Sequence, residues 1–129
     1  MMNSIIFDMD GVLFDSERIY YRAWLQAARK LKLPEIDECV THCVGRNGSD
    51  IRDYLLGKYG SGFRGDAFIE DIRAAFSKMV AAEGLPVKAG VREILTWLTD
   101  KQWNIALATS SGKNGAERNL TVSGQARFF

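Results

Sequence analysis

The stretch Ser4-Ile5-Ile6-Phe7-Asp8-Met9-Asp10-Gly11 decides the fold of this chain. Its first four residues form a short apolar run, rich in isoleucine, that predicts a buried β-strand. A helix is the competing interpretation at this length, but the Asp10-Gly11 pair indicates a turn directly after the run. We therefore predict a strand that ends at a pair of carboxylates.

Beyond Gly11 the sequence is mostly helical. From Ser16 onward apolar residues recur at helical spacing, which predicts a helix, with Leu31 on its buried face, that ends before Pro34. Either Ser49 or Asp50 can cap a helix further along. The other predicted helices lie at residues 37–43, 66–83, 91–98 and, more weakly, 115–122.

A second strand is predicted over residues 104–108, which makes the fold class α/β. A strand–helix–strand unit with polar residues after both strands is typical of a parallel sheet. We assign residues 1–14 and 86–129 to a partial Rossmann-like core that holds only the first strands, and residues 15–85 to an inserted α-helical domain. The exposed edges of two short strands favour self-association of the chain.

The composition argues against two kinds of partner. The chain has 129 residues with 17 basic and 16 acidic side chains, so no strong field favours nucleic acid or a membrane surface. No apolar run approaches the ~20 residues of a membrane span. The N-terminal sequence also lacks the basic region of a signal peptide, so we expect a cytoplasmic protein in which Cys39 and Cys43 stay reduced.

Asp8 and Asp10 are the candidate catalytic residues. They follow the first strand, where open α/β sheets bind their ligands, and Gly11 permits a turn that brings them together. Two carboxylates favour a hard cation such as Mg²⁺, so both are also candidate metal ligands. One carboxylate can attack phosphorus to give an aspartyl-phosphate, while the other serves as general acid and base. The alternative is an Asp-x-Asp-Gly turn that occurs by chance.

A polar cluster follows the second strand and is the candidate phosphate site. Thr109 and Ser110 offer a hydroxyl and backbone N–H groups leading into a helix, and Lys113 adds positive charge nearby. A helix cap formed by Thr109-Ser110-Ser111 and a solvated Lys113 are the alternatives.

These residues resemble a known family. The run Phe7-Asp8-Met9-Asp10-Gly11-Val12-Leu13-Phe14-Asp15-Ser16-Glu17 is similar to motif I of haloacid dehalogenase-like hydrolases, especially the branch with phosphoglycolate phosphatase and β-phosphoglucomutase. Residues 106–111 (Ala-Leu-Ala-Thr-Ser-Ser) look like motif II, and residues 86–91 look like the return from a helical cap to the core. The resemblance covers essentially the whole chain.

The resemblance implies a Mg²⁺-dependent phosphatase that hydrolyses a small phosphomonoester, such as a sugar phosphate or phosphoglycolate, through an aspartyl-phosphate. Asp8 would be the nucleophile and a metal ligand, and Asp10 the general acid/base with its backbone carbonyl on the metal. Thr109 would bind the phosphoryl group, helped by the backbone of Ser110. Residues 15–85 would be a cap that excludes water and selects the substrate.

Arg46 and Asn47, in the loop between two cap helices, would be candidates for substrate contact, with a solvated turn as the alternative. Mutase members of the family carry a histidine in the first cap helix. Here the corresponding position is Tyr20, and the chain's one histidine is His42. This difference favours hydrolysis over a mutase reaction, which stays the alternative.

The family's third and fourth motifs, a lysine and an acidic pair, come well after motif II. Only 20 residues follow Thr109, and no acidic residue follows Glu117. We therefore expect the chain to be the N-terminal part of a longer enzyme.

Other kinds of function remain open. Cys39, His42 and Cys43 lie within about one helical turn and imitate part of a zinc site, although no second Cys/His pair exists. An incomplete chain can also act as a non-catalytic binding module. A receiver domain, which also phosphorylates an aspartate, is disfavoured because the roughly 70-residue insertion after the first strand far exceeds the usual connection.

Overall fold

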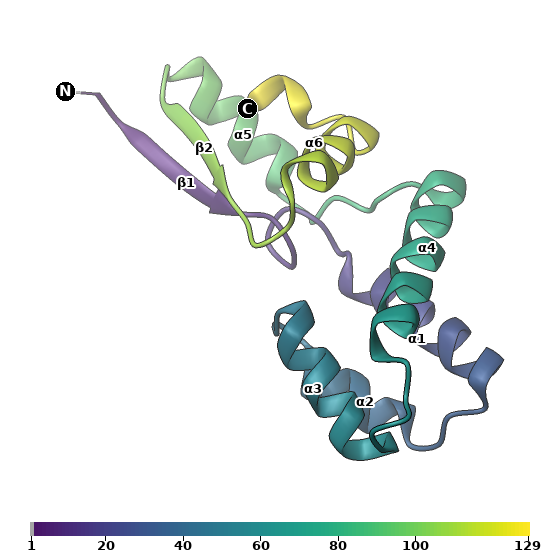
Figure 1. The fold of residues 1–129 in the computed structure, drawn as a ribbon. Helices are drawn as coiled ribbons and strands as arrows, with labels where there is room; N and C mark the ends of the chain where they lie inside the picture. The colour runs from purple at the N-terminus through teal and green to yellow at the C-terminus, as the bar shows by residue number, and fades with distance from the viewer. Residues whose placement is uncertain (1) are drawn as a thin grey trace. The chain divides into compact units, whose positions relative to one another are not determined.

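The computed structural model describes residues 2–129, and the chain divides into two compact units (Figure 1). The first, called the core unit, comprises the residues up to Glu17 together with Ala81–Phe129. The second, called the helical unit, is Arg18–Val80. That these units act as hydrolase core and cap stays a prediction.

The core unit is built on two parallel strands. Strand β1 (Ser4–Asp8) pairs with β2 (Asn104–Ala108) in a register that runs from Ser4 opposite Asn104 to Asp8 opposite Ala108. The predicted α/β class is confirmed, because a parallel pair needs a crossover connection that contains helix. Figure 1 shows the two strands side by side, and both point their carboxyl ends the same way.

Helices cover one face of this sheet. Helix α5 (Val91–Asp100) contacts β2, and a short 3₁₀ helix η1 (Ala126–Phe128) contacts both α5 and α6 (Lys113–Val122). In β1 the side chains of Ile5 and Phe7 are half-buried, whereas Ile6 between them is 70% exposed. Among the described residues, therefore, the opposite face of the sheet has no cover, although parallel sheets are normally buried on both faces.

The two connections to the helical unit are bonded to each other inside the core unit. The N–H of Asp15 donates to the carbonyl of Pro86 at 2.9 Å, and the N–H of Lys88 donates to the carbonyl of Leu13, also at 2.9 Å. Phe14 and Val87 form an antiparallel bridge between these bonds. The departing and returning segments thus fix each other beside the end of β1.

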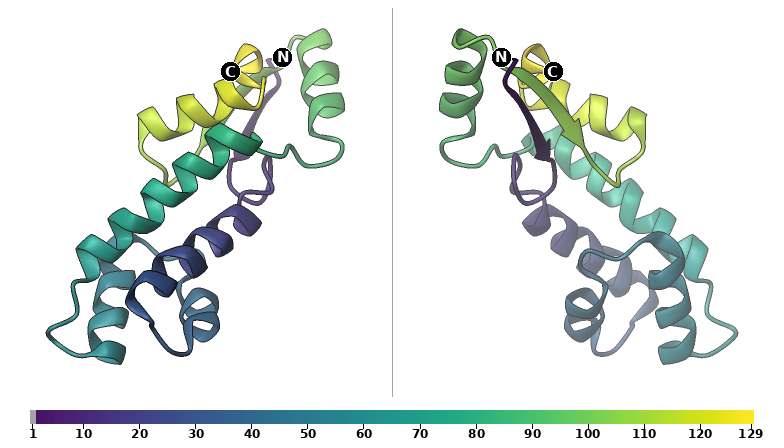
Figure 2. Two further views of the ribbon diagram at one scale, coloured as in Figure 1. Left: turned by 90° about the vertical axis from the view of Figure 1, so that its right-hand side faces the viewer. Right: turned by 90° about the vertical axis from the view of Figure 1, so that its left-hand side faces the viewer.

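The helical unit consists of α1 (Glu17–Leu31), α2 (Ile36–Cys43), α3 (Gly48–Tyr59) and α4 (Gly65–Glu83), whose end turns extend into the core unit. Helices α1 and α4 lie side by side in both views of Figure 2. Their contact is aromatic: the rings of Trp24 and Phe68 meet edge to face at 5.5 Å, and those of Tyr20 and Phe76 stack at 3.9 Å. No described helix is both long and apolar enough to cross a membrane.

Some details of the sequence prediction were wrong. Helix α3 begins at Gly48 and is capped by Asn47, not by Ser49 or Asp50, because the Asn47 side-chain oxygen accepts the N–H of Asp50. Leu31 is half exposed instead of buried. It is the last residue of α1, and the chain turns away at Lys32, whose φ is +53°.

The contact of α5 with the sheet predicts where the core unit is sensitive to mutation. Leu95 is 0% exposed, so Leu95→Ala is expected to lower the free energy of unfolding by about 3 kcal/mol through lost burial and a residual cavity. Ile94, on the same helix, is 39% exposed, and Ile94→Ala is expected to cost less than about 1 kcal/mol. Urea unfolding measures both; equal losses would contradict this packing.

Candidate active site

The loop after β1 presents two carboxylates. Asp8 is the last residue of β1 and is exposed, and its Oδ1 accepts the N–H of Met9 at 2.8 Å. Directly afterwards the chain folds back, with the N–H of Gly11 donating to the carbonyl of Phe14 at 3.0 Å. Gly11 has φ +76°, a left-handed conformation that residues with a Cβ rarely adopt. The turn predicted from the Asp10-Gly11 pair is therefore present.

Asp10 is fixed by two serine hydroxyls. The hydroxyl of Ser16, which is 1% exposed, donates to Asp10 Oδ1 at 2.9 Å. The hydroxyl of Ser111 donates to Oδ2 at 3.3 Å. Ser111 follows β2 and lies 101 positions away in sequence, so this contact joins the loops after the two strands.

The candidate phosphate residues lie at the end of β2. Asp8 and Ala108 are register partners, so Thr109 directly follows the residue opposite Asp8. The Thr109 hydroxyl oxygen accepts the N–H of Ser111 at 3.1 Å, while Ser110 between them is exposed. The structure contradicts the helix-cap alternative for this cluster, because α6 has Gly112 at its N-cap position without a side-chain cap bond.

Lys113 is placed differently from Thr109 and Ser110. It is the first residue of α6, its side chain is 85% exposed, and its Nζ lies 3.9 Å from Glu117 Oε1, one helical turn on. This weak surface ion pair contributes little to stability. A role for Lys113 in phosphate binding stays a prediction, and in the structure its ammonium group lies near Glu117.

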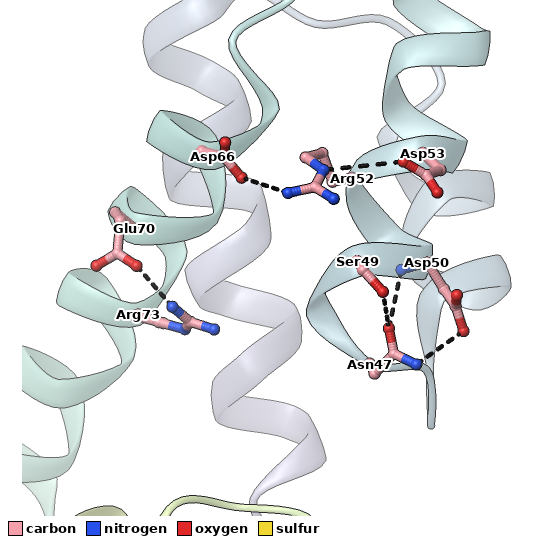
Figure 3. A network of polar contacts seen from close by, with 8 residues as sticks. All are labelled: Asn47, Ser49, Asp50, Arg52, Asp53, Asp66, Glu70 and Arg73. Atoms are coloured by element: carbon pink, nitrogen blue, oxygen red, sulfur yellow. Dashed lines mark hydrogen bonds and ion pairs between the residues drawn. The ribbon is translucent and has the colours of Figure 1, made fainter.

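Arg46 and Asn47 belong to the helical unit, in the loop before α3. Figure 3 shows Asn47 turned into the start of that helix, where its Oδ1 accepts from Ser49 at 2.8 Å and from the Asp50 N–H at 2.9 Å. Its Nδ2 donates to Asp50 Oδ2 at 3.1 Å. Arg46 is exposed. Asn47 thus has a structural role as the N-cap of α3, whereas the Arg46 side chain is exposed to solvent.

A family model described as haloacid dehalogenase-like hydrolase matches residues 5–129, nearly the whole chain. The chain belongs to the haloacid dehalogenase-like hydrolase family. This finding confirms the family that the motifs around Asp8 and Thr109 indicated.

A curated relative of this chain is a phosphorylated carbohydrates phosphatase of Thermotoga maritima, 30% identical over 134 residues. The match covers 99% of this chain and 59% of the relative. A solved Thermotoga maritima structure, provisionally named a β-phosphoglucomutase, is 26% identical with a TM-score of 0.77, covering 99% of this chain and 59% of the other. The chain therefore spans about 59% of the length of these relatives.

A β-phosphoglucomutase structure from Clostridium difficile is 21% identical, with a TM-score of 0.77, and covers 100% of this chain and 60% of the other. At this identity the likeness shows the fold alone. It agrees with the α/β architecture described above.

The residues of this chain fit a Mg²⁺ ion in part. Asp8 offers a carboxylate and Asp10 a backbone carbonyl, both of which are hard oxygen ligands of the kind that Mg²⁺ prefers. Within residues 2–129 no cluster of three or more acidic, histidine or cysteine side chains could hold a metal ion. The pair suits a cation that takes its remaining ligands from water, phosphate or other protein groups, as Mg²⁺ commonly does.

Sequence reasoning did not single out Ser16 or Ser111 as site residues, yet they contact the candidate acid/base. A signal was present for each. Ser16 is part of the motif I run, and Ser111 is part of the polar cluster after β2. The contact of Ser111 with Asp10 could not be foreseen without knowing that the two strands are direct neighbours, whereas that of Ser16 depends on how the loop after β1 folds.

The two cysteines lie in the helical unit and are buried. Cys39 Sγ lies 3.2 Å from the hydroxyl of Tyr59, and that hydroxyl donates to the carbonyl of Pro34 at 2.7 Å. His42 is exposed and stacks on Tyr54 with ring centroids 4.0 Å apart. Among the described residues, these three candidate zinc ligands do not form a group that could hold a metal ion. Burial raises the pKa of the Cys43 thiol to about 11.

The role of Asn47 as the N-cap of α3 can be tested by its effect on stability. Asn47→Ala is expected to lower the free energy of unfolding by about 1 kcal/mol, because the N-terminus of α3 loses its side-chain acceptor. Asn47→Ser retains a side-chain oxygen that can accept the Asp50 N–H, without placing a second carboxylate beside that of Asp50, and is expected to stay within about 0.5 kcal/mol of the parent. Thermal unfolding monitored by circular dichroism measures both. Equal destabilisation by the two changes would rule out the capping role.

The raised pKa of Cys43 predicts low thiol reactivity. The thiol should stay protonated as the pH rises through its ordinary value of 9.0 and ionise only towards about 11. In the parent chain near pH 8, with the labelled cysteine identified by peptide mass spectrometry, alkylation of Cys43 by iodoacetamide is expected to be roughly 100-fold slower than in the same chain unfolded in guanidinium chloride, because the thiolate is the nucleophile. Equal rates would show that Cys43 is not buried in solution.

Proposed function

We propose that this hydrolase is a Mg²⁺-dependent phosphatase that acts on a small phosphomonoester through a phosphorylated Asp8. The observation that carries the proposal is the meeting of three chemical groups at the carboxyl ends of two paired strands. Asp8 ends β1, Asp10 is bonded to Ser111 beyond β2, and Thr109 is bonded to the same serine. This arrangement supports roles for Asp8 as nucleophile, Asp10 as acid/base and Thr109 as phosphate ligand, because all three follow the carboxyl ends of the paired strands.

In the proposed reaction Asp8 attacks phosphorus. Its Oδ1 is engaged by the Met9 N–H, which orients the carboxylate and leaves Oδ2 for the attack. The P–O bond to the leaving group breaks, and the leaving oxygen takes a proton from Asp10. Water then attacks phosphorus, Asp10 removes a proton from it, and the bond between Asp8 and phosphorus breaks to release phosphate. Both carboxyl groups return to their starting state.

A Mg²⁺ ion bound by Asp8 and Asp10 would neutralise negative charge where the carboxylate and the phosphate approach each other. The Thr109 hydroxyl can rotate to donate to a phosphate oxygen, because in the present arrangement its oxygen acts as acceptor for the Ser111 N–H. The exposed Ser110 backbone adds a candidate donor beside it.

The substrate class proposed is a phosphorylated carbohydrate or a small phosphorylated acid such as phosphoglycolate. The name of the Thermotoga maritima phosphatase supports the first. Hydrolysis is preferred to a mutase reaction because Tyr20, at the position of the mutase histidine, stacks on Phe76 and contributes to the packing of α1 against α4. The name of the Thermotoga maritima structure, which is 26% identical, keeps the mutase reaction as the second candidate.

The proposal includes a longer polypeptide. The chain spans about 59% of its relatives, and its described sheet has two strands with one uncovered face. Self-association through the open strand edges is the alternative, and it would pair the backbone groups that these edges leave exposed.

A cytoplasmic setting is part of the proposal and is supported by two buried thiols that are not paired in a disulfide.

Asp8→Asn tests the proposed nucleophile. Release of inorganic phosphate from p-nitrophenyl phosphate and from glucose 6-phosphate, measured on the complete gene product, is expected to require Mg²⁺ and to fall at least about 1,000-fold in the variant. Asp53→Asn makes the same chemical change on an exposed turn of α3 and should leave activity unchanged. Phosphate release that survives Asp8→Asn, or that falls equally in both variants, would contradict the proposal.

A further inference from the structure

Ser111 contacts two of the groups on which the proposed reaction depends. Its N–H donates to the Thr109 hydroxyl oxygen at 3.1 Å, and its own hydroxyl donates to Asp10 Oδ2 at 3.3 Å. The residue is half-buried and lies in the loop between β2 and α6. One side chain therefore connects the candidate phosphate ligand to the candidate acid/base.

The second hydrogen bond on Asp10 determines the orientation of its carboxylate. Ser16 alone, bonded to Oδ1, would leave the group free to rotate about that contact. With Ser111 bonded to Oδ2, both oxygens are engaged and the plane of the carboxylate is defined. Each carboxylate oxygen has two lone pairs, so both bonds leave a position free for a proton or a substrate oxygen.

We propose that Ser111 is a positioning residue that directs Asp10 towards the leaving-group oxygen of a phosphomonoester bound at Thr109. This inference rests on the proposed phosphatase function. Proton transfer requires the acid within about 2.6–3.2 Å of the oxygen that it protonates. A displacement of about 1 Å at such a group can cost about 100-fold in rate.

The leaving group provides a readout that a purely structural role would not move. An alkoxide leaving from a sugar phosphate needs a proton as the P–O bond breaks, whereas p-nitrophenolate is a far weaker base and leaves without one. Because kcat/KM reports the steps up to the departure of that group, it senses the acid role of Asp10 and not the later attack by water. Misdirected Asp10 should therefore impair glucose 6-phosphate hydrolysis selectively.

The test uses Ser111→Ala in the complete gene product with Mg²⁺. The value of kcat/KM for glucose 6-phosphate is expected to fall about 100-fold, and the value for p-nitrophenyl phosphate less than about 10-fold. Both substrates are measured on one preparation, so the ratio of the two values does not depend on the fraction of protein that is folded.

Two variants serve as comparisons. Ser111→Thr keeps a hydroxyl and is expected to restore the parent ratio. Ser123→Ala removes a serine hydroxyl that donates to the Leu120 carbonyl at 3.0 Å in the same unit, and it should leave the ratio unchanged.

Three results would overturn the inference. Parent-like values for Ser111→Ala would show that Ser111 is dispensable. Equal losses with both substrates would show that its hydroxyl binds phosphate or maintains the fold instead of directing Asp10. A ratio that Ser111→Thr fails to restore would exclude the hydroxyl as the cause. Failure of the proposed function itself is distinguishable, because Asp8→Asn would then retain activity whatever Ser111→Ala does.

Discussion

The parallel pairing of β1 with β2 is the constraint on which the rest of this structure depends. Five register pairs place Asp8 opposite Ala108, so the loops that follow the two strands emerge side by side. Asp10 and Ser111, far apart in sequence, then come within hydrogen-bond distance. The same pairing leaves one face of the sheet open, where Ile6 is exposed to solvent. A longer polypeptide, or a second copy of the chain, would have to cover it.

The chemical groups at the strand ends depend on backbone geometry as much as on side chains. Gly11 permits the reversal after Asp10, and the Met9 N–H orients Asp8. Ser16 is buried where the core unit ends, and its hydroxyl fixes one oxygen of Asp10. This bond stabilises the folded state, because a hydroxyl that is shielded from water must find its acceptor within the protein. The site is therefore organised by the core unit itself.

Family membership and residue chemistry answer different questions here. The family match covers nearly the whole chain and shows which family the chain belongs to. The substrate depends on side chains that the family does not fix. In the helical unit, Asn47 caps α3 and Tyr20 packs on Phe76, so two residues that a motif comparison would assign to substrate selection are engaged in folding. Arg46, exposed in the same loop, is left as the candidate for contact with a ligand.

The sequence by itself determined both strands, the helices to within about two residues, and the positions of Asp8, Asp10 and Thr109. These follow from local rules: apolar periodicity, the turn chemistry of Asp-Gly, and a motif that is contiguous in the chain. Only the tertiary structure decided that Ser111 bonds Asp10 rather than capping α6, that Asn47 rather than Ser49 caps α3, and that Ile6 stays uncovered. The physical reason is that a hydrogen bond or a buried face is a property of two segments. Its second partner is set by strand register and packing, which no local pattern encodes.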